Sequence, residues 1–340
     1  MSMKRLVPPA LALLLAVTAL ASLFLGQYQV TPGQMLAFIG GKLFGAGWGG
    51  GLDATLLPLI DNVLIDIRLP RILAACLIGA SLAVSGTSFQ ALFINPLVSP
   101  GLLGVLAGAS FGAALGMILS DSWLVVQCST LFFGGAAVMA AVLITRIFVG
   151  NSAIMLVLGG IISGAFFTAA LSIIKYTADP SNQLPAITYW LMGSLSAVNL
   201  QTILILAPIM LAAIFFLTIH GGRLNVLSMG EEEAAALGLN VARTRLIIIF
   251  LATMASAMTV VIGGVIGWVG LIIPHICRML IGPDNRLLLP TSALLGALYL
   301  LVVDDICRLV FTFEIPLGIV TSLIGIPFFL LVLKNAKRGW

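Results

Sequence analysis

Long apolar runs, nearly free of charged residues and separated by short polar stretches, make up most of the chain. Each run has at least the roughly 17 residues that a helix needs to cross a bilayer. The runs cover about residues 6–25, 72–120, 124–148, 153–174, 200–219, 246–262, 287–303 and 317–333. The pattern therefore predicts membrane-spanning helices over these ranges.

The run over 72–120 is long enough for two spans, and turn residues divide it. The segments 95–96 (NP) and 99–101 (SPG) fall in its middle, and such clusters mark turns. Residues 263–280 are rich in glycine and include Pro274. We expect a short or broken helix there, packed inside the bundle, because free backbone groups at membrane depth must be covered by protein. The predicted spans then number ten.

The stretches between the spans are polar. Residues 27–66 predict a long loop outside the membrane, and residues 188–194 predict a short helix within a second loop. The run over 6–25 follows Lys4 and Arg5 and resembles a signal peptide. It is longer than the 7–15 apolar residues of such a segment, so we interpret it as the first span.

Glycines at four-residue spacing predict close helix packing. They form one ridge over residues 104–116 and a second pair at 160 and 164. Small residues at this spacing let helix backbones approach closely in lipid. We interpret them as packing residues and not as a pore lining, which would need polar neighbours.

The composition supports an integral membrane protein. Of 340 residues, 61% are hydrophobic and 8% are charged, with a mean hydropathy of +1.19. The average globular protein has about 25% charged residues. No hydrophilic block is large enough for a separate domain, so we expect one transmembrane domain over residues 1–340. The net charge of +4 is spread over the loops, which argues against nucleic-acid binding.

The distribution of lysine and arginine predicts the orientation. With ten spans and the N-terminus inside, 11 of the 16 basic residues fall on the cytoplasmic side. Such an excess belongs on that side of the membrane. Both termini are therefore expected in the cytoplasm.

The chain offers little catalytic chemistry. The four cysteines lack metal-ligand spacing, and residues 40–42 (GGK) lack the Ser or Thr of a Walker A motif. His220 and His275 are the only histidines, and we interpret each as hydrogen-bonded structure; contact with a transported ligand stays open. No charged residue falls in the middle of a predicted span, which argues against an ion-coupled transporter and against an enzyme within the membrane.

Residues 224–240 (LNVLSMGEEEAAALGLN) form the longest polar interruption on the predicted cytoplasmic face. Ser228 and Glu231 have the spacing of a capping box, and Gly238 predicts the end of the helix. The pattern indicates a helix of nine or ten residues, about 228–239, between the sixth and seventh spans. It suits either docking of another protein or a resting place at the lipid interface.

Four segments resemble the permease subunits of bacterial type II ABC importers. They are RLPRILAACLIGASLAVSGTSFQALFINPLVSPGLLGVLAGA (68–109), GEEEAAALGL (230–239), GWVGLIIPHICRMLIGPDNR (267–286) and EIPLGIVTSLIGIPFFL (314–330). This is the FecCD group, which includes cobalamin, haem and ferric-siderophore permeases. The resemblance implies an all-α integral membrane protein with the type II ABC importer permease fold of ten transmembrane helices.

The resemblance also implies the roles of particular residues. Contacts with an ATPase would come from Ser228, Gly230, Glu231, Glu232, Glu233, Ala235, Leu237 and Gly238. Docking of a periplasmic binding protein would involve Arg68, Arg71 and Arg308 at the outer rim. The cytoplasmic gate would contain Asn95, Leu97, Asn151 and Ser152. No residue is assigned to catalysis or to a metal.

The implied assembly lies in the bacterial inner membrane. It comprises a homodimer of this chain, two cytoplasmic ATPase subunits and a periplasmic binding protein. ATP and Mg²⁺ would bind the ATPase, and this chain would need no cofactor. The expected cargo is an iron chelate, a ferric siderophore or haem. Cobalamin, a molybdate-type oxyanion and, in a different class, ion-coupled secondary transport are the alternatives.

Overall fold

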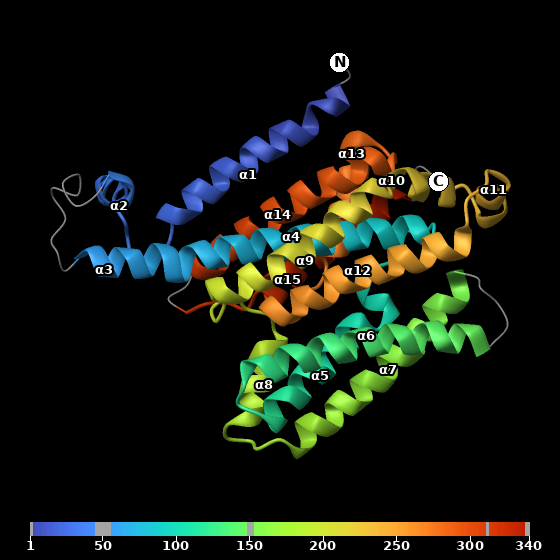
Figure 1. Ribbon diagram of the computed structural model, residues 1–340, viewed down its shortest axis with the longest axis horizontal. Coiled ribbons are helices and arrows are strands. Elements are labelled where there is room, and N and C mark those ends of the chain that lie inside the picture. Colours follow the sequence, from blue (N-terminus) through green and yellow to red (C-terminus); the bar gives the residue numbers. More distant parts are fainter. Residues whose placement is uncertain (1–2, 45–55, 148–152, 311–312, 337–340) are drawn as a thin grey trace.

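The computed structural model describes residues 3–44, 56–147, 153–310 and 313–336, and all regular structure in these ranges is helical. The long helices run roughly along one axis of the molecule (Figure 1). Helices α2 (Pro32–Phe44) and α3 (Leu56–Asp61) lie towards one end of that axis, and α11 (Glu231–Ala236) lies at the other.

Within the described ranges, seven helices are long and apolar enough to cross a membrane, by length and composition. They are α1 (Val7–Phe24), α4 (Leu69–Leu92), α6 (Trp123–Ile147), α7 (Ala153–Thr177), α9 (Leu200–Ile219), α12 (Val241–Gly263) and α14 (Asn285–Leu309). Three further helices with shorter apolar stretches are α5 (Val105–Leu119), α13 (Val269–Ile281) and α15 (Leu317–Ala336). These helices coincide with the predicted spans. The count of ten is not confirmed, because three of the apolar stretches are short for a crossing.

The remaining helices are short. They are η1 (Met3–Arg5), the π-helix η2 (Asn62–Arg68), η3 (Pro100–Leu103), α8 (Gln183–Leu191) and α10 (Gly221–Leu227). Helix α8 corresponds to the predicted short helix at 188–194 but begins five residues earlier. The division of the 72–120 run is confirmed, since α4 ends at Leu92 and α5 begins at Val105.

The expectation of a loop over residues 27–66 is wrong for the described part of that segment. It contains α2, α3 and η2, and its apolar side chains Val30, Met35, Phe38, Ile60 and Leu64 form a small core of their own. Helices α3, η2 and α4 join into one helix over Pro58–Leu92, 35 residues long. At 1.5 Å per residue it spans roughly 52 Å, so it extends well beyond the ~30 Å hydrocarbon core.

The predicted broken helix over residues 263–280 is confirmed. Residues 264–268 are not helical, and α13 begins only at Val269. Gly264 has a φ of +68°, and the carbonyl oxygen of Gly263 accepts a hydrogen bond from the backbone of Ser194 at 3.0 Å. Protein therefore covers backbone groups that the break frees, as membrane depth requires.

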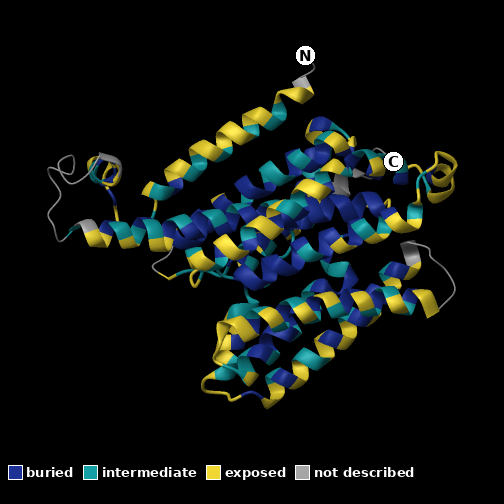
Figure 2. Cartoon of the chain, in the orientation of Figure 1, coloured by how far each residue is buried: buried dark blue, intermediate teal, exposed yellow. Residues whose placement is uncertain are grey.

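Helix α4 lies at the centre of the bundle and α1 at its edge. Figure 2 shows α4 mostly buried and α1 mostly exposed. In the most apolar window of each, 78% of the α4 residues and 6% of the α1 residues are buried. Because α4 packs against α9, α12, α13 and α14, movement of α4 must be shared with these helices.

Glycines allow the closest helix contacts. A Cβ added to Gly79 would lie 2.1 Å from the carbonyl oxygen of Gly296 on α14, and one on Gly86 would lie 1.9 Å from that of Gly270 on α13. The predicted ridge on α5 packs in the same way, since a Cβ on Gly108 would lie 2.3 Å from the backbone of α6. The interpretation of these glycines as packing residues is confirmed.

We predict that Gly79→Ala lowers the midpoint of thermal unfolding of the purified protein in detergent. The added methyl group overpacks the α4–α14 contact, which costs about 1–3 kcal/mol. The matched control is Gly135→Ala on α6, where a Cβ would meet nothing within 4 Å. Equal midpoints for the two variants would contradict the packing account.

Candidate functional site at the two ends of the helix bundle

The loop between α9 and α12 holds two short helices, α10 and α11, where the sequence predicts one helix of nine or ten residues. Helix α11 begins after Gly230, whose φ of +123° favours glycine. The predicted capping box is wrong. The Ser228 hydroxyl lies at the end of α10 and donates to the carbonyl oxygens of Leu224 at 2.8 Å and Ala91 at 3.3 Å.

Two side chains attach α11 to the bundle. Ala234 is fully buried against the apolar cluster formed by the ends of α4, α9 and α12. Glu231 forms an ion pair with Arg245 on α12. Because Arg245 is mostly buried and Glu231 is about half exposed, this pair ties the start of α11 to the first turns of α12.

The predicted end of the helix at Gly238 is confirmed. Gly238 has a φ of +82°, and its backbone N–H donates to the carbonyl oxygen of Ala235 at 2.9 Å. The next residue, Leu239, donates to Ala234 at 3.0 Å. This pair of bonds is the Schellman motif, in which a glycine in the left-handed conformation satisfies the last carbonyl groups.

Residues 229–238, which we call the α11 knob, present a mixed apolar and acidic surface at this end of the bundle. Leu237 is 65% and Met229 is 63% exposed, and Glu232 and Glu233 are exposed beside them. Clustered exposed apolar side chains with a polar rim are a feature of protein-interaction sites. The knob brings together the predicted ATPase-coupling residues Gly230, Glu231, Glu232, Glu233, Ala235, Leu237 and Gly238, and Ser228 lies directly before it.

The predicted gate residues Asn95 and Leu97 lie in the exposed turn after α4. The Asn95 side-chain oxygen accepts from the Leu97 backbone at 2.9 Å. The preceding residue, Ile94, has a φ of +50°, which is rare for a β-branched residue. The bond from Ser228 to Ala91 places this turn beside the α11 knob. The other predicted gate residues, Asn151 and Ser152, lie outside the described residues.

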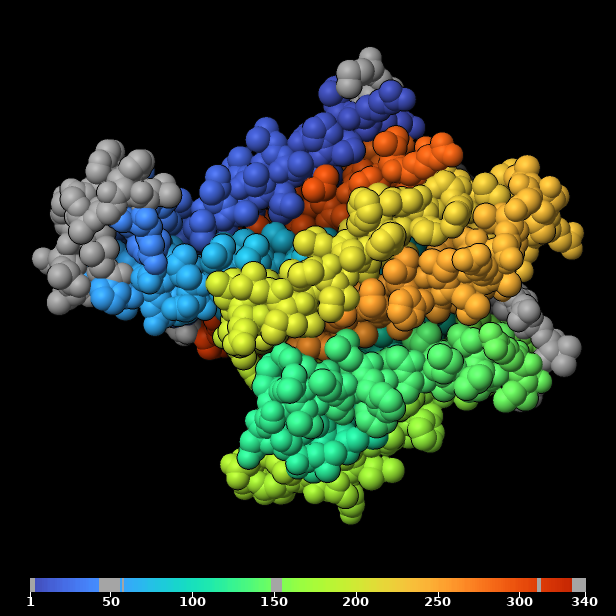
Figure 3. Space-filling model, viewed as in Figure 1, coloured from blue at the N-terminus to red at the C-terminus, as the bar shows by residue number. Residues whose placement is uncertain are grey.

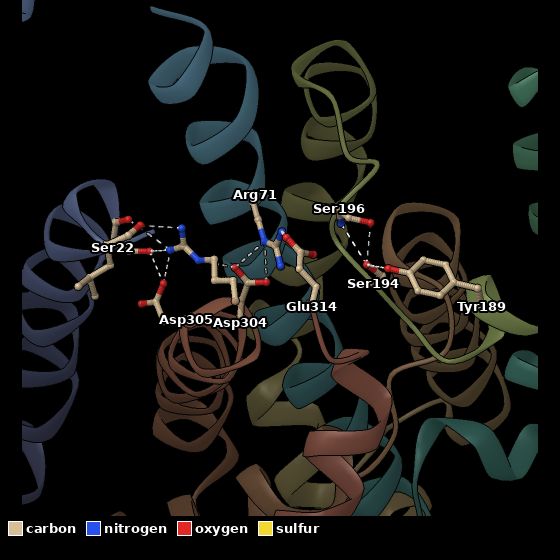
Figure 4. A network of polar contacts seen from close by, with 10 residues as sticks. Ser22, Arg71, Tyr189, Ser194, Ser196, Asp304, Asp305 and Glu314 are labelled. Carbon is tan, nitrogen blue, oxygen red and sulfur yellow. Dashed lines mark hydrogen bonds and ion pairs between the residues drawn. The ribbon is translucent and has the colours of Figure 1, made fainter. Parts of the chain in front are cut away.

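At the opposite end, Arg71 lies in a network of charged groups (Figure 4). Its Nε donates to both carboxylate oxygens of Asp304 at 2.9 Å, and one terminal nitrogen donates to Glu314 at 2.7 Å. Asp304 is fully buried, whereas the Glu314 side chain is 34% exposed. Arg71 thereby joins the first turns of α4 to α14 and to the segment before α15.

A second arginine extends the network to α1. Arg308 forms ion pairs with Asp304 and Asp305, and it donates to the backbone carbonyl oxygen of Leu25 at 2.9 Å. The Ser22 hydroxyl on α1 donates to Asp305 at 2.6 Å. Because Leu25 follows the last residue of α1, Arg308 places positive charge at the negative end of that helix.

Arg68 also places positive charge near the C-terminal end of α1. Its guanidinium group donates to the carbonyl oxygens of Leu23 and Tyr28, at and just after the end of α1. Arg68, Arg71 and Arg308 are 3%, 6% and 7% exposed. Each guanidinium group is therefore buried with partners inside the subunit, and docking of a binding protein at these arginines stays a prediction.

Sequence reasoning missed the acidic members of this network, Asp304, Asp305 and Glu314. The segment DDICR offers one signal, since Asp304 and Arg308 are four residues apart and lie on one helix face. The pairing of Arg71 with Glu314 has no such signal, because 243 residues separate the two.

Hydroxyl groups and apolar surface lie near the network. The Ser194 hydroxyl lies 2.9 Å from that of Ser196 and 3.5 Å from that of Tyr189 (Figure 4). An apolar hollow of about 510 Å³ lies alongside α15, lined in part by Met192 and Ile319. The Leu317 backbone donates to Gly193 at 2.8 Å, so this segment is fixed to the start of α15.

The interpretation of His220 as hydrogen-bonded structure is confirmed. One ring nitrogen lies 2.8 Å from the Phe216 carbonyl oxygen, and the other lies 3.0 Å from the Arg223 guanidinium group. His275 is partly exposed on α13. Within the described ranges, no group of three or more His, Cys, Asp or Glu side chains could hold a metal ion.

We predict that Asp304→Ala lowers the free energy of unfolding by about 3–5 kcal/mol, because it leaves Arg71 and Arg308 buried without their shared carboxylate. The control is Asp61→Ala, which removes an ion pair with Lys42 whose side chains are 43% and 59% exposed. Such a surface pair contributes about 0–1 kcal/mol. The thermal unfolding midpoints of the two variants are measured in detergent and compared with that of the wild-type protein. Shifts of equal size would contradict a structural role for Asp304.

Comparisons with known proteins agree with this geometry. The molybdate import system permease protein MolB of Haemophilus influenzae is 39% identical, covering 97% of this chain and 95% of that protein. The hemin transport system permease protein HmuU of Yersinia pestis is 38% identical, covering 82% of this chain and 85% of that protein. A solved structure described as an inward-facing, metal-chelate type ABC transporter has a TM-score of 0.84 and 36% identity, covering 98% of this chain and 99% of that one.

These matches confirm the all-α membrane fold of an ABC permease and the resemblance drawn from the sequence. The FecCD transport family matches residues 14–335, which is nearly the whole chain. The chain therefore belongs to the FecCD transport family.

Proposed function

We propose that this chain is the permease subunit of an ATP-driven importer that moves an iron chelate, a ferric siderophore or haem, from periplasm to cytoplasm by alternating access. The observation that carries the proposal is the α11 knob, an exposed apolar and acidic surface at one end of a membrane bundle. Such a surface is a site for another protein, and in this family that protein is an ATPase.

The energy for transport would come from the ATPase. ATP and Mg²⁺ bind there, and this chain holds no cofactor of its own. The knob would move with the ATPase and pass that movement to α4 through the bond from Ser228 to Ala91, directly before the turn with Asn95 and Leu97. This is rigid-body coupling between two states, with that turn as the cytoplasmic gate.

Two copies of the chain would enclose the pathway. Helices α7 and α15 expose large apolar side chains along much of their described length, including Ile161, Phe166, Leu323 and Leu330. The apolar hollow beside α15 suits a bulky ligand that makes few specific contacts. In the inner membrane, both termini and the α11 knob would face the cytoplasm.

Molybdate is the second candidate cargo. The MolB relative, which covers nearly all of both chains, favours it. An oxyanion and an iron chelate differ in charge and size, yet selectivity of the complete importer can reside in the binding protein. Cobalamin is a further alternative within the family.

Uptake into proteoliposomes tests the function. The chain is reconstituted with its ATPase and binding protein, and ferric siderophores, haem, cobalamin and molybdate are compared as labelled cargo. We expect accumulation of an iron chelate only with ATP and with both partners present. Accumulation of molybdate alone would reassign the cargo, and uptake driven by a proton gradient without ATP would refute the proposal.

Leu237→Asp tests the knob in the same assay. A charge at the centre of an apolar contact removes a hot spot worth about 2 kcal/mol or more, so ATP-driven uptake should fall at least about tenfold. The control, Leu119→Asp, changes a leucine that is 69% exposed at the end of α5. Unaltered uptake by Leu237→Asp would show that the ATPase docks elsewhere.

The binding protein would dock at the end of the bundle that carries Arg68, Arg71 and Arg308. Glu314 forms an ion pair with Arg71, and its side chain is partly exposed. A carboxylate of the binding protein could therefore take the place of Glu314 as the partner of Arg71. We predict that Glu314→Gln strengthens docking several-fold at low salt and less at high salt, because salt screens exposed charges. Asp66→Asn, an exposed carboxylate at the same end, controls for the change in net charge. Equal affinities of the two variants at every ionic strength would exclude Arg71 from docking.

A further inference from the structure

Arg278 on α13 lies near the end of the bundle that carries the α11 knob, and the structure gives it no ionic partner. The side chain is partly exposed, and one terminal guanidinium nitrogen is buried without a hydrogen bond. No ion pair joins Arg278 to any carboxylate of the described residues. A guanidinium group with unused donors at a membrane boundary can bind an acceptor from outside the chain.

The carboxylates at this end are engaged or distant. Glu231 pairs with Arg245, and Glu232 and Glu233 lie on the knob. Asp284 accepts from the Asn225 side chain at 2.6 Å and from the backbone of Arg286. These bonds lower the pKa of Asp284, so it stays ionised in that contact. The acceptor for Arg278 is therefore not among these groups.

Two further cations lie beside α13. Helix η1, which contains Lys4 and Arg5, packs against α13, and a Cβ on Gly282 would lie 3.4 Å from the Lys4 ammonium nitrogen. Gly282 caps the end of α13, and its backbone N–H donates to the carbonyl oxygen of Arg278 at 2.9 Å, so Lys4 lies about one helical turn beyond Arg278. Within the described residues, Lys4 and Arg5 also have no carboxylate partner. We call Lys4, Arg5 and Arg278 the basic cluster.

The surroundings of the basic cluster favour lipid over protein. Helix α1 is the least buried of the candidate spans, so a membrane would cover most of its surface. Figure 3 shows the start of α1 and the adjoining surface of α13 at one edge of the molecule, apart from the α11 knob. Basic pockets between helices at the cytoplasmic boundary suit the headgroups of anionic lipids.

We propose that the basic cluster binds the phosphate group of an anionic phospholipid from the cytoplasmic leaflet. The phosphate oxygens would accept hydrogen bonds from Arg278 and Lys4, and the acyl chains would lie along α1. The site would fix the start of α1 to α13. The inference rests on the proposed function only for the orientation, in which the knob faces the cytoplasm.

Native mass spectrometry of the full chain, released from nanodiscs that contain phosphatidylglycerol and phosphatidylcholine, tests the site. The wild-type protein should retain phosphatidylglycerol selectively. Lys4→Gln combined with Arg278→Gln should lower that retention, by about fivefold for each cation removed. The control is Arg243→Gln, which removes one positive charge from an exposed position at the start of α12 and is matched in charge to Arg278→Gln alone.

A conservative variant separates binding from folding. Lys4→Arg with Arg278→Lys keeps both charges and should retain the lipid, even if the glutamine variants unfold. Equal retention by the wild-type protein, the glutamine double variant and the Arg243 control would overturn the proposal. Loss of ATPase binding in the glutamine variant with lipid retention unchanged would overturn the proposal and assign the basic cluster to the ATPase. No ATPase or cargo is present in the lipid assay. The lipid result can therefore be interpreted even if the transport proposal fails.

Discussion

Close packing of α4 against α13 and α14 is the constraint on which the rest of the structure depends. Gly79 meets Gly296, and Gly86 meets Gly270, at distances that leave no room for a side chain. Helices in such contact cannot slide independently, because packed interiors are dense and transmit strain. The three helices therefore form one body that reaches both ends of the bundle, and α4 carries Arg71 near one end and leads into the turn with Asn95 and Leu97 at the other.

The two ends use polar groups differently. At the end that carries Arg71, the buried carboxylate of Asp304 is shared by Arg71 and Arg308, because buried charges must be paired or hydrogen-bonded. At the other end, α11 has one fully buried residue, Ala234, and otherwise exposes its surface. The Asp304 network fixes α1 and the segment before α15 to the central body, while the knob leaves most of its surface open to a partner.

Much of this arrangement is predictable from local patterns. Charge-free runs predict the spans, the turn residues at 95–101 divide two of them, and Gly238 ends α11 as expected. Each of these features depends on residues close in sequence. The failed capping box at Ser228 is also local, since its hydroxyl bonds the preceding turn and Gly230 intervenes before α11.

The environment of the arginines could not be predicted in that way. Arg71 is buried because Asp304 and Glu314, more than 230 residues later, fold onto it. The helices within residues 27–66 were likewise missed, because their small core forms only when α2 packs near α3 and η2. The position of the knob residues on a short helix follows from the sequence, whereas the environment of Arg68, Arg71 and Arg308 depends on tertiary contacts.

Cross-linking of the knob to the ATPase tests most directly whether the bundle is driven through α11. A cysteine is introduced as Leu237→Cys in a chain that carries Cys128→Ser, because Cys128 is an exposed native thiol. Tyr176→Cys, at a position 91% exposed near the end of α7, is the comparison. We expect a short thiol-to-amine cross-linker to join the ATPase to the Leu237→Cys protein alone. Cross-linking through position 176 and not through position 237 would contradict the account.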